Sequence, residues 1–355
     1  MFEIRLARES DKPEILSLLR EIFDDETADR AARRWDWQWN ADPRLSSPGY
    51  SGFVIEWRGS LIASIAMMPA GLFLKGKAVE AIWLAESFVH RHRLKQAVRE
   101  ARKAGLMDQC PDFSNGLIGA ILNHEDCPRY QLGKHLTDAA KVGCYKVGAT
   151  DQPGTGSWTR LISLKGLLAS YIGRLPGGLL GRFIDLFLPG IPRAKYEAEP
   201  LAGPFDQGFD ALWHNAIDRH EAITRRDADF LNWRYRQNPD TEYHVKVVRD
   251  GEAVRGYIVY STFARHGQLR AHVMDFLVEN DDVDLLASVF IACLRHLKQE
   301  GITKIECYTG SSVAVSVLSS LGFRQRFHKG NTLSTLVRRI DVTELYVTRG
   351  DGDGG

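Results

Sequence analysis

The sequence lacks an excess of charge of either sign. Lysine and arginine number 46 and aspartate and glutamate 45, so the net charge of the 355 residues is +1. A nearly neutral chain has no overall field that attracts nucleic acid, and any basic site must be local. The chain also lacks an apolar run long enough to span a membrane and a recognisable signal peptide. We therefore expect a cytoplasmic protein with no nucleic-acid partner.

Cysteine is scarce. The five cysteines include no Cys-x-x-Cys pair, so the sequence indicates neither a disulfide framework nor a zinc site, and we expect no metal. The polar run His124–Cys127 would need ligands or a base from elsewhere in the chain before it bound a metal or acted as a nucleophile. With 44% hydrophobic and 26% charged residues, the composition is that of a globular protein with room for two domains.

Glycine is absent from one informative stretch, residues 81–104. Ile82–Val89 is mostly apolar and predicts a strand that carries a single carboxylate, Glu86. The basic run His90–Arg93 follows, and then apolar residues at helical spacing as far as Gly105, where a helix would end. Cations at the start of a helix predict an anion site. The alternative is a solvated basic turn.

Several landmarks occur twice in the same order. Trp37–Pro43 and Trp233–Pro239 share the pattern Trp-x-aromatic-x-x-x-Pro, and the helix-ending glycines Gly105 and Gly301 lie the same distance apart along the chain. This predicts two copies of one α/β fold; the alternative is coincidence between unrelated domains. Aromatic residues beside arginines would suit base stacking, but their recurrence favours a tryptophan packed in the core of each copy.

The element order predicts two domains and a linker. We expect an N-terminal domain at 1–149, an amphipathic helical linker at 150–204, a C-terminal domain at 205–346 and a disordered tail at 347–355. The basic amphipathic segment 158–195 suits either a membrane surface or, as we favour, a strap across the two domains. The expected strands are 2–6, 52–57, 61–67, 82–89, 116–122, 243–248, 256–260 and 271–278, and the expected helices are 11–22, 94–104, 127–132 and 283–299.

Five segments together resemble the Gcn5-related N-acetyltransferase (GNAT) family. Phe2–Asp11 resembles the opening strand and turn, Glu86–His90 the fourth strand, and Ser319–Phe323 the late Leu-Gly-Phe turn, of which Gln131–Gly133 is a weaker copy. Arg226–Tyr235 resembles a segment of bacterial proteins with two such domains. The resemblance implies an α/β fold with mixed sheets, in two tandem GNAT-like domains joined by the helical linker.

The resemblance also implies a donor site. In this family an acyl thioester such as acetyl-CoA lies where the sheet splays, so its pantetheine would pair with Phe88 and Val89. The family's glycine-rich pyrophosphate loop is missing here, because Gly105 stands at the end of a helix. His90, Arg91 and Arg93 would then bind the phosphates through side chains.

Three further residues receive roles by the same resemblance. Glu86 would accept the proton of the amine, Tyr130 would protonate the leaving thiolate, and Asn123 would bind the pantetheine. Tyr130 lies one residue closer to its glycine than is usual in the family. The alternative for Glu86 is a carboxylate that faces solvent or pairs with an arginine, and the alternative for Asn123 is a turn residue. In the second domain Asp275 matches Glu86, but the acids of Glu279–Asp282 would cap the helix and repel phosphate.

The expected activity is N-acyl transfer from a thioester, acetyl-CoA first, to an amine of a small molecule. One alternative is a donor carried by an acyl carrier protein or an aminoacyl-tRNA, which the missing glycines favour. Another is a degenerate GNAT domain pair that binds a ligand or partner without turnover.

Overall fold

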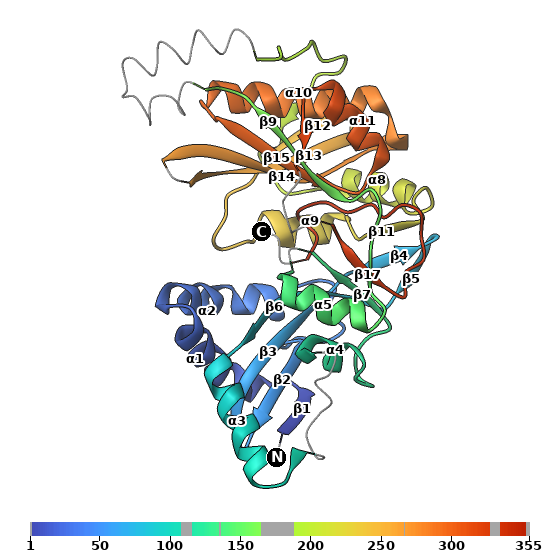
Figure 1. Cartoon of the computed structure of the whole chain (residues 1–355). Helices are drawn as coiled ribbons and strands as arrows, with labels where there is room; N and C mark the ends of the chain where they lie inside the picture. The colour runs from blue at the N-terminus through green and yellow to red at the C-terminus, as the bar shows by residue number, and fades with distance from the viewer. Residues whose placement is uncertain are drawn as a thin grey trace.

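A computed structural model describes residues 2–107, 116–134, 136–164, 188–265, 267–326 and 334–352. The chain forms two lobes, each built on a mixed seven-stranded sheet with helices packed against it (Figure 1). The predicted α/β architecture with mixed sheets in two units is therefore confirmed. The predicted domain boundaries remain a prediction, because each sheet includes a strand from outside its own stretch of sequence. Within the described residues no helix is both long and apolar enough to cross a membrane.

The first lobe is organised around β6, at the centre of the sheet β1-β2-β3-β6-β7-β17-β8. Its strands pair antiparallel except β6 with β7, which are parallel. Helix α2 begins at a cap in which the Asp24 side chain accepts a hydrogen bond from the Thr27 amide, as is typical of helix N-termini. The elements are β1 (Phe2–Leu6), α1 (Lys12–Ile22), α2 (Asp25–Trp39), β2 (Gly52–Trp57), β3 (Ser60–Pro69), β6 (Ala81–Val89), α3 (Arg91–Lys103), α4 (Gly116–Leu122), β7 (Tyr130–Gly133) and α5 (Asp138–Lys146).

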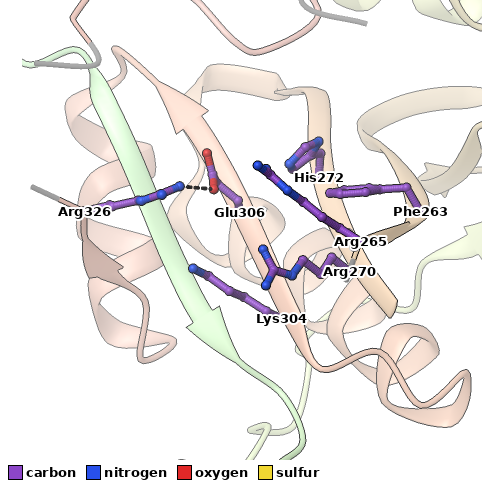
Figure 2. Close-up of a pocket in the computed structure, with 8 residues that line it drawn as sticks. Phe263, Arg265, Arg270, His272, Lys304, Glu306 and Arg326 are labelled. Atoms are coloured by element: carbon purple, nitrogen blue, oxygen red, sulfur yellow. Dashed lines mark hydrogen bonds and ion pairs between the residues drawn. The ribbon is translucent and has the colours of Figure 1, made fainter. Parts of the chain in front are cut away.

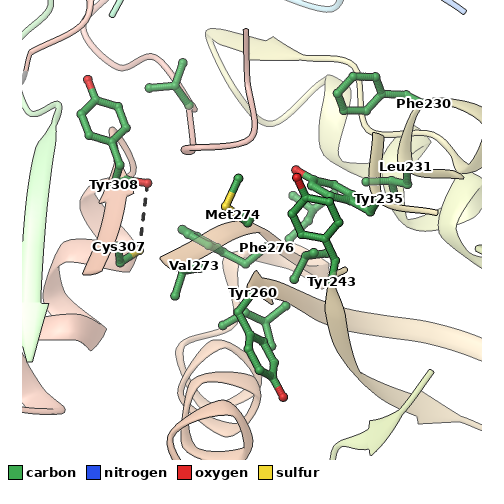
Figure 3. Packing of buried hydrophobic residues seen from close by; sticks show 14 of the residues in the cluster. Phe230, Leu231, Tyr235, Tyr243, Tyr260, Val273, Met274, Phe276, Cys307 and Tyr308 are labelled. Atoms are coloured by element: carbon green, nitrogen blue, oxygen red, sulfur yellow. Dashed lines mark hydrogen bonds between the residues drawn. The ribbon is translucent and has the colours of Figure 1, made fainter. Parts of the chain in front are cut away.

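The second lobe has the sheet order β10-β12-β13-β14-β15-β9-β16. Its core is rich in aromatic residues, and Figure 3 shows Met274 and Phe276 of β14 packed among tyrosines. Asp282 caps α10 by accepting hydrogen bonds from two backbone amides, which is the structural role predicted for this junction. The elements are β10 (Glu199–Pro200), α8 (Gln207–Ile217), α9 (Ala228–Tyr235), β12 (His244–Asp250), β13 (Ala253–Arg265), β14 (Gln268–Val278), α10 (Val283–Gln299), β15 (Lys304–Thr309), α11 (Ser312–Ser320) and β16 (Arg324–Gln325).

The two lobes exchange strands. Strand β9 (Gly156–Leu161) leaves the first lobe and lies between β15 and β16 of the second. Strand β17 (Leu336–Arg338) returns to the first lobe and lies between β7 and β8 (Thr150–Asp151). Residues 150–151 and 156–161 at the start of the predicted linker therefore belong to the two sheets. Most of its predicted helical stripe lies in 165–187, outside the described residues.

The repeated tryptophans meet each other across the two lobes. The rings of Trp37 and Trp233 stack with centroids 4.9 Å apart. Each indole N–H donates to the other residue's carbonyl oxygen, at 2.8 Å and 2.7 Å. The prediction that they are core residues is confirmed, but each packs on its counterpart instead of anchoring a helix to its own sheet. A small third sheet of β4 (Leu72–Leu74), β5 (Lys77–Val79) and β11 (Ala222–Thr224) also joins the lobes.

Two elements of the first lobe were predicted with the wrong type. Gly116–Leu122 is helix α4 instead of a strand, and strand β7 (Tyr130–Gly133) takes up the second half of the predicted helix 127–132. A short, wholly apolar run fits a buried strand and a buried helix equally well. The type of β7 is set by pairing with β6 and β17, which are distant in sequence and leave no local signal.

Candidate active site

Strand β6 carries a β-bulge at Glu86. On β3, Ile65 pairs with Ser87 and the next residue, Ala66, pairs with Ala85, so Glu86 is the extra residue. Its φ of 32° lies in the left-handed region, which costs a residue with a side chain of order 1–3 kcal/mol. Bulges re-aim side chains next to active sites. The bulge thus sets the direction in which the only carboxylate of β6 points.

A cleft of about 730 Å³ opens beside the bulge. Strands β6 and β7 pair only as far as Leu84 and Gly133, and the cleft lies beyond that point. The β3 side of Phe88 and Val89 is paired, so the opposite backbone edge is the one that borders the cleft. The lining comes from β6, the start of α3, α4 and α5, namely Ser87–Val89, His90–His92, Gly116–Ile118, Thr137, Ala139, Ala140 and Gly143, together with residues of α1 and β3.

The start of α3 forms one end of this cleft. The His90 ring nitrogen Nδ1 accepts a hydrogen bond from the Arg93 amide and caps the helix. Arg91 is exposed and lines the cleft. Arg93 lies outside the lining, because its guanidinium donates to both carboxylate oxygens of Glu21 at 2.6 Å and to the Leu61 carbonyl at 3.0 Å. Of the two predicted arginines, the structure brings only Arg91 to the cleft.

A second cavity, of about 320 Å³, lies at the bulge itself. Glu86, Arg30 and Arg34 line it. Phe23, Ser87 and Phe88 line both cavities. Burial lowers the pKa of the Arg34 guanidinium and nearby Arg234 lowers it further, while Glu86 acts in the opposite direction. Arg34 therefore supplies a positive charge near Glu86. Sequence reasoning missed it, since an arginine just before the tryptophans of α2 gives no sign of facing β6.

Two predicted site residues do not reach the cleft. Tyr130 is the first residue of β7 and pairs with Ala81, where the two strands are still joined. Asn123 follows helix α4, and its side-chain oxygen accepts a hydrogen bond from Arg338 of β17 at 2.7 Å. The roles predicted for both residues rested on the wrong element types for this part of the chain. The structure assigns them to the support of the first sheet.

In the second lobe the corresponding space is filled by the end of the chain. Strand β14 also has a bulge, at Met274, since Asp275 pairs with Val259 and Val273 with Tyr260. The Gly350 amide donates to the Met274 carbonyl at 2.6 Å, and the Tyr346 hydroxyl donates to the Phe276 carbonyl. On the β15 side, the Gly310 amide donates to the Val347 carbonyl, so the segment 346–350 lies between β14 and β15.

A buried group of charges holds this segment. The Arg226 guanidinium contacts Asp275 at 3.0 Å and Asp351 at 2.8 Å, and all three side chains are almost fully buried. Burial alone would raise the pKa of Asp351, but Arg226 and Lys134 outweigh it and lower that pKa. The prediction of a disordered tail is wrong for 347–352. Asp275, proposed as the counterpart of Glu86, is an ion-pair partner one residue past the bulge.

His220 packs on this segment and makes stability depend on pH. Its ring lies 4.6 Å from that of Tyr346, and burial, followed by nearby Arg226, lowers its pKa to about 4. The unfolded state takes up the proton near pH 6.5, so this contribution is complete above pH 6.5 and is lost as pH falls toward 4. We expect a loss of about 2–3 kcal/mol over that window. Urea unfolding of His220→Phe should lack this part of the pH dependence; the same slope in both proteins would contradict the assignment.

Among the described residues no group of three or more His, Cys, Asp or Glu side chains is placed to hold a metal ion. The first lobe brings together the carboxylate of Glu86 beside an arginine, an open strand edge and a helix N-terminus. Such a set can bind an extended polar chain and accept a proton.

Comparisons with known proteins identify this architecture. No protein-family model matches the sequence, and no curated protein matches it. A GCN5-related N-acetyltransferase from Anabaena variabilis is similar in structure, with a TM-score of 0.59 and 11% identity over 95% of this chain and 72% of that one. N-myristoyltransferase of Saccharomyces cerevisiae, solved with bound myristoyl-CoA, has a TM-score of 0.54 and 12% identity over 95% and 81%. A probable N-acyltransferase from Enterococcus faecalis has a TM-score of 0.56 and 9% identity over 95% and 72%.

At these identities the likeness establishes the fold. The chain has the GNAT fold, which the resemblance of its sequence predicted. The two seven-stranded lobes of this chain fall within the 95% that the N-acetyltransferase and N-myristoyltransferase structures match.

Proposed function

We propose that this protein is an N-acyltransferase whose first lobe binds an acyl thioester in the β6–β7 cleft and transfers the acyl group to an amine of a small molecule. The observation that carries the proposal is a pair of cavities that share Phe23, Ser87 and Phe88, the smaller of which is also lined by Glu86. A thioester in the larger cavity and an amine in the smaller one would meet at the bulge. Acetyl-CoA is the expected donor.

The residues of the first lobe suit each step of that reaction. The open edge at Phe88 and Val89 would pair with the amides of the pantetheine arm. His90, Arg91 and His92 at the start of α3 would face the phosphates. The amine nitrogen bonds to the carbonyl carbon, the C–S bond breaks, the proton of the amine passes to Glu86, and the thiolate takes a proton from water. Arg34 lines the same cavity as Glu86 and would place a positive charge beside it.

The second lobe supplies no donor site in this proposal. The space between β14 and β15 holds the chain's own segment 346–350, which bonds to the Met274 and Phe276 positions of β14. A pantetheine arm would have to displace that segment and break into the buried ion pairs of Arg226. Donor binding is thus assigned to one lobe, with one turnover site per chain.

Carriage of the donor by an acyl carrier protein is a second candidate, favoured by the charge of α3. This helix starts at the cleft and carries six arginines and lysines but one glutamate. Most of these cations are exposed. A basic helix at the mouth of a thioester cleft would attract an acidic carrier that presents the thioester on its own arm.

Calorimetry on Ala140→Trp tests both candidates. Ala140 lines the cleft from α5, so an indole there should block the thioester arm. We expect acetyl-CoA to bind the wild type and Ala140→Trp to bind it at least about tenfold more weakly. Val142→Trp, on the same helix with Val142 53% exposed, is the matched control. Heat with an acylated carrier protein but none with acetyl-CoA would select the second candidate, and no binding of either would refute the cleft as a donor site.

A further inference from the structure

A pocket lined by cations lies on the second lobe, away from the β6–β7 cleft. Its volume is about 170 Å³, and it is lined by residues of β13, β14 and β15 and by Arg326, which follows β16. Figure 2 shows the side chains of Arg265, Arg270, Lys304 and Arg326 extending into the same space, with Glu306 among them. No role in donor binding or proton transfer falls to these residues.

The register of the strands places like charges side by side. Arg270 of β14 is the direct partner of Lys304 on the parallel strand β15, and His272 is the partner of Glu306 in the next row. Like charges directly opposite each other on one face of a sheet destabilise it. Arg265, two residues beyond the β13 partner of Arg270, adds a third cation on the same face. The repulsion between these neighbouring cations is unfavourable for the sheet, and local features of this kind are expected at functional sites.

The positive charge of this pocket is only partly compensated. Glu306 pairs with Arg326 at 3.1 Å and lies 3.7 Å from Arg349. In the described part of the chain Arg265, Arg270 and Lys304 have no carboxylate within ion-pair distance. Arg270 gives one N–H to Gln268, while its Nε is buried without an acceptor. Burial, followed by nearby Arg326, lowers the pKa of Lys304, while Glu306 acts in the opposite direction and Arg270 lowers it further.

We propose that this pocket binds a phosphate monoester. The dianion carries three acceptor oxygens, which match two guanidinium groups and one ammonium. A carboxylate would neutralise only one of the three cations. The volume is well below the roughly 300–1,000 Å³ of sites for larger organic ligands. The pocket therefore suits a single phosphoryl group, either of a small molecule or of a phospholipid head group.

Titration calorimetry at constant ionic strength tests this site with inorganic phosphate and methyl phosphate. We expect saturable binding to the wild type, and Lys304→Met should weaken it about tenfold or more. Lys298→Met is the matched control, because Lys298 is exposed on α10. Arg265→Gln, at an exposed position, should also weaken binding and gives a second readout if Lys304→Met does not fold.

The outcomes separate the possible sources of the phosphoryl group. Binding of methyl phosphate indicates a small molecule, and binding only to vesicles that contain phosphatidic acid, not to phosphatidylcholine alone, indicates a lipid. Either result supports the site if Lys304→Met reduces it. No binding of any of these probes, or acetate bound as tightly as phosphate, would overturn the proposal. Neither result bears on donor binding in the first lobe, because the experiment uses no thioester.

Discussion

Replacing Glu86 with glutamine is expected to lower kcat for acyl transfer by about 10²–10⁴-fold while leaving the affinity for the donor unchanged. Glutamine has the same shape and keeps the bulge, but it cannot take the proton of the amine. Glu86 does not line the larger cavity proposed for the donor, so the contacts of the donor should persist. Release of free thiol with a panel of amines measures the rate, and calorimetry measures the affinity.

The control for this variant is Glu3→Gln, since Glu3 is an exposed carboxylate on β1 of the same sheet. It should retain the full rate. A Glu86→Gln protein with wild-type kcat would exclude this carboxylate as the base. If the wild type binds the donor but acylates no amine, the result would support the alternative that the protein binds a ligand or partner without catalysis.

Arg226→Met is expected to destabilise the protein by about 3–5 kcal/mol, because it leaves two buried carboxylates without their counter-charge. Asp275 and Asp351 both depend on this guanidinium, and Asp351 belongs to the segment that fills the second lobe. Equilibrium unfolding in urea, followed by tryptophan fluorescence, measures the change. The surface control Arg219→Met should shift stability by no more than about 0.5 kcal/mol.

The design includes a partial rescue. Adding Asp275→Asn to Arg226→Met removes one of the two uncompensated charges, so the double variant should recover part of the loss. A loss below about 1 kcal/mol in the single variant would mean that these ion pairs do not hold the C-terminal segment in place.

The sequence predicted those features that are marked locally. Trp37 and Trp233 stand in equal patterns, and their equivalence in the fold follows from that spacing. The strand at Ile82–Val89 and the helix after it were also predicted, because apolar periodicity and Gly105 mark their limits. The anion site predicted at the start of α3 was only partly correct. Arg91 borders the cleft, but the attraction of Glu21 for Arg93 comes from α1 and is invisible in the local pattern.

Features that depend on distant partners could not be predicted. The bulge at Glu86 arises from the register between β3 and β6. The glycine-rich end was read as disordered from its composition, yet Gly350 is glycine because the Tyr235 hydroxyl occupies the space of a Cβ. Asp351 and Arg226 attract each other across most of the second lobe's sequence. The composition of a segment indicates how much apolar surface it can bury by itself. It does not indicate that a distant part of the fold, here the space between β14 and β15, will bind the segment.

The exchange of β9 and β17 has a consequence for biosynthesis. The first lobe's sheet lacks an inner strand until residues 336–338 have left the ribosome, because β17 separates β7 from β8. The second sheet can close only after β16 (Arg324–Gln325) is translated, and the first only after β17. During that interval β7 would present an unpaired edge, a feature that invites wrong association between nascent chains.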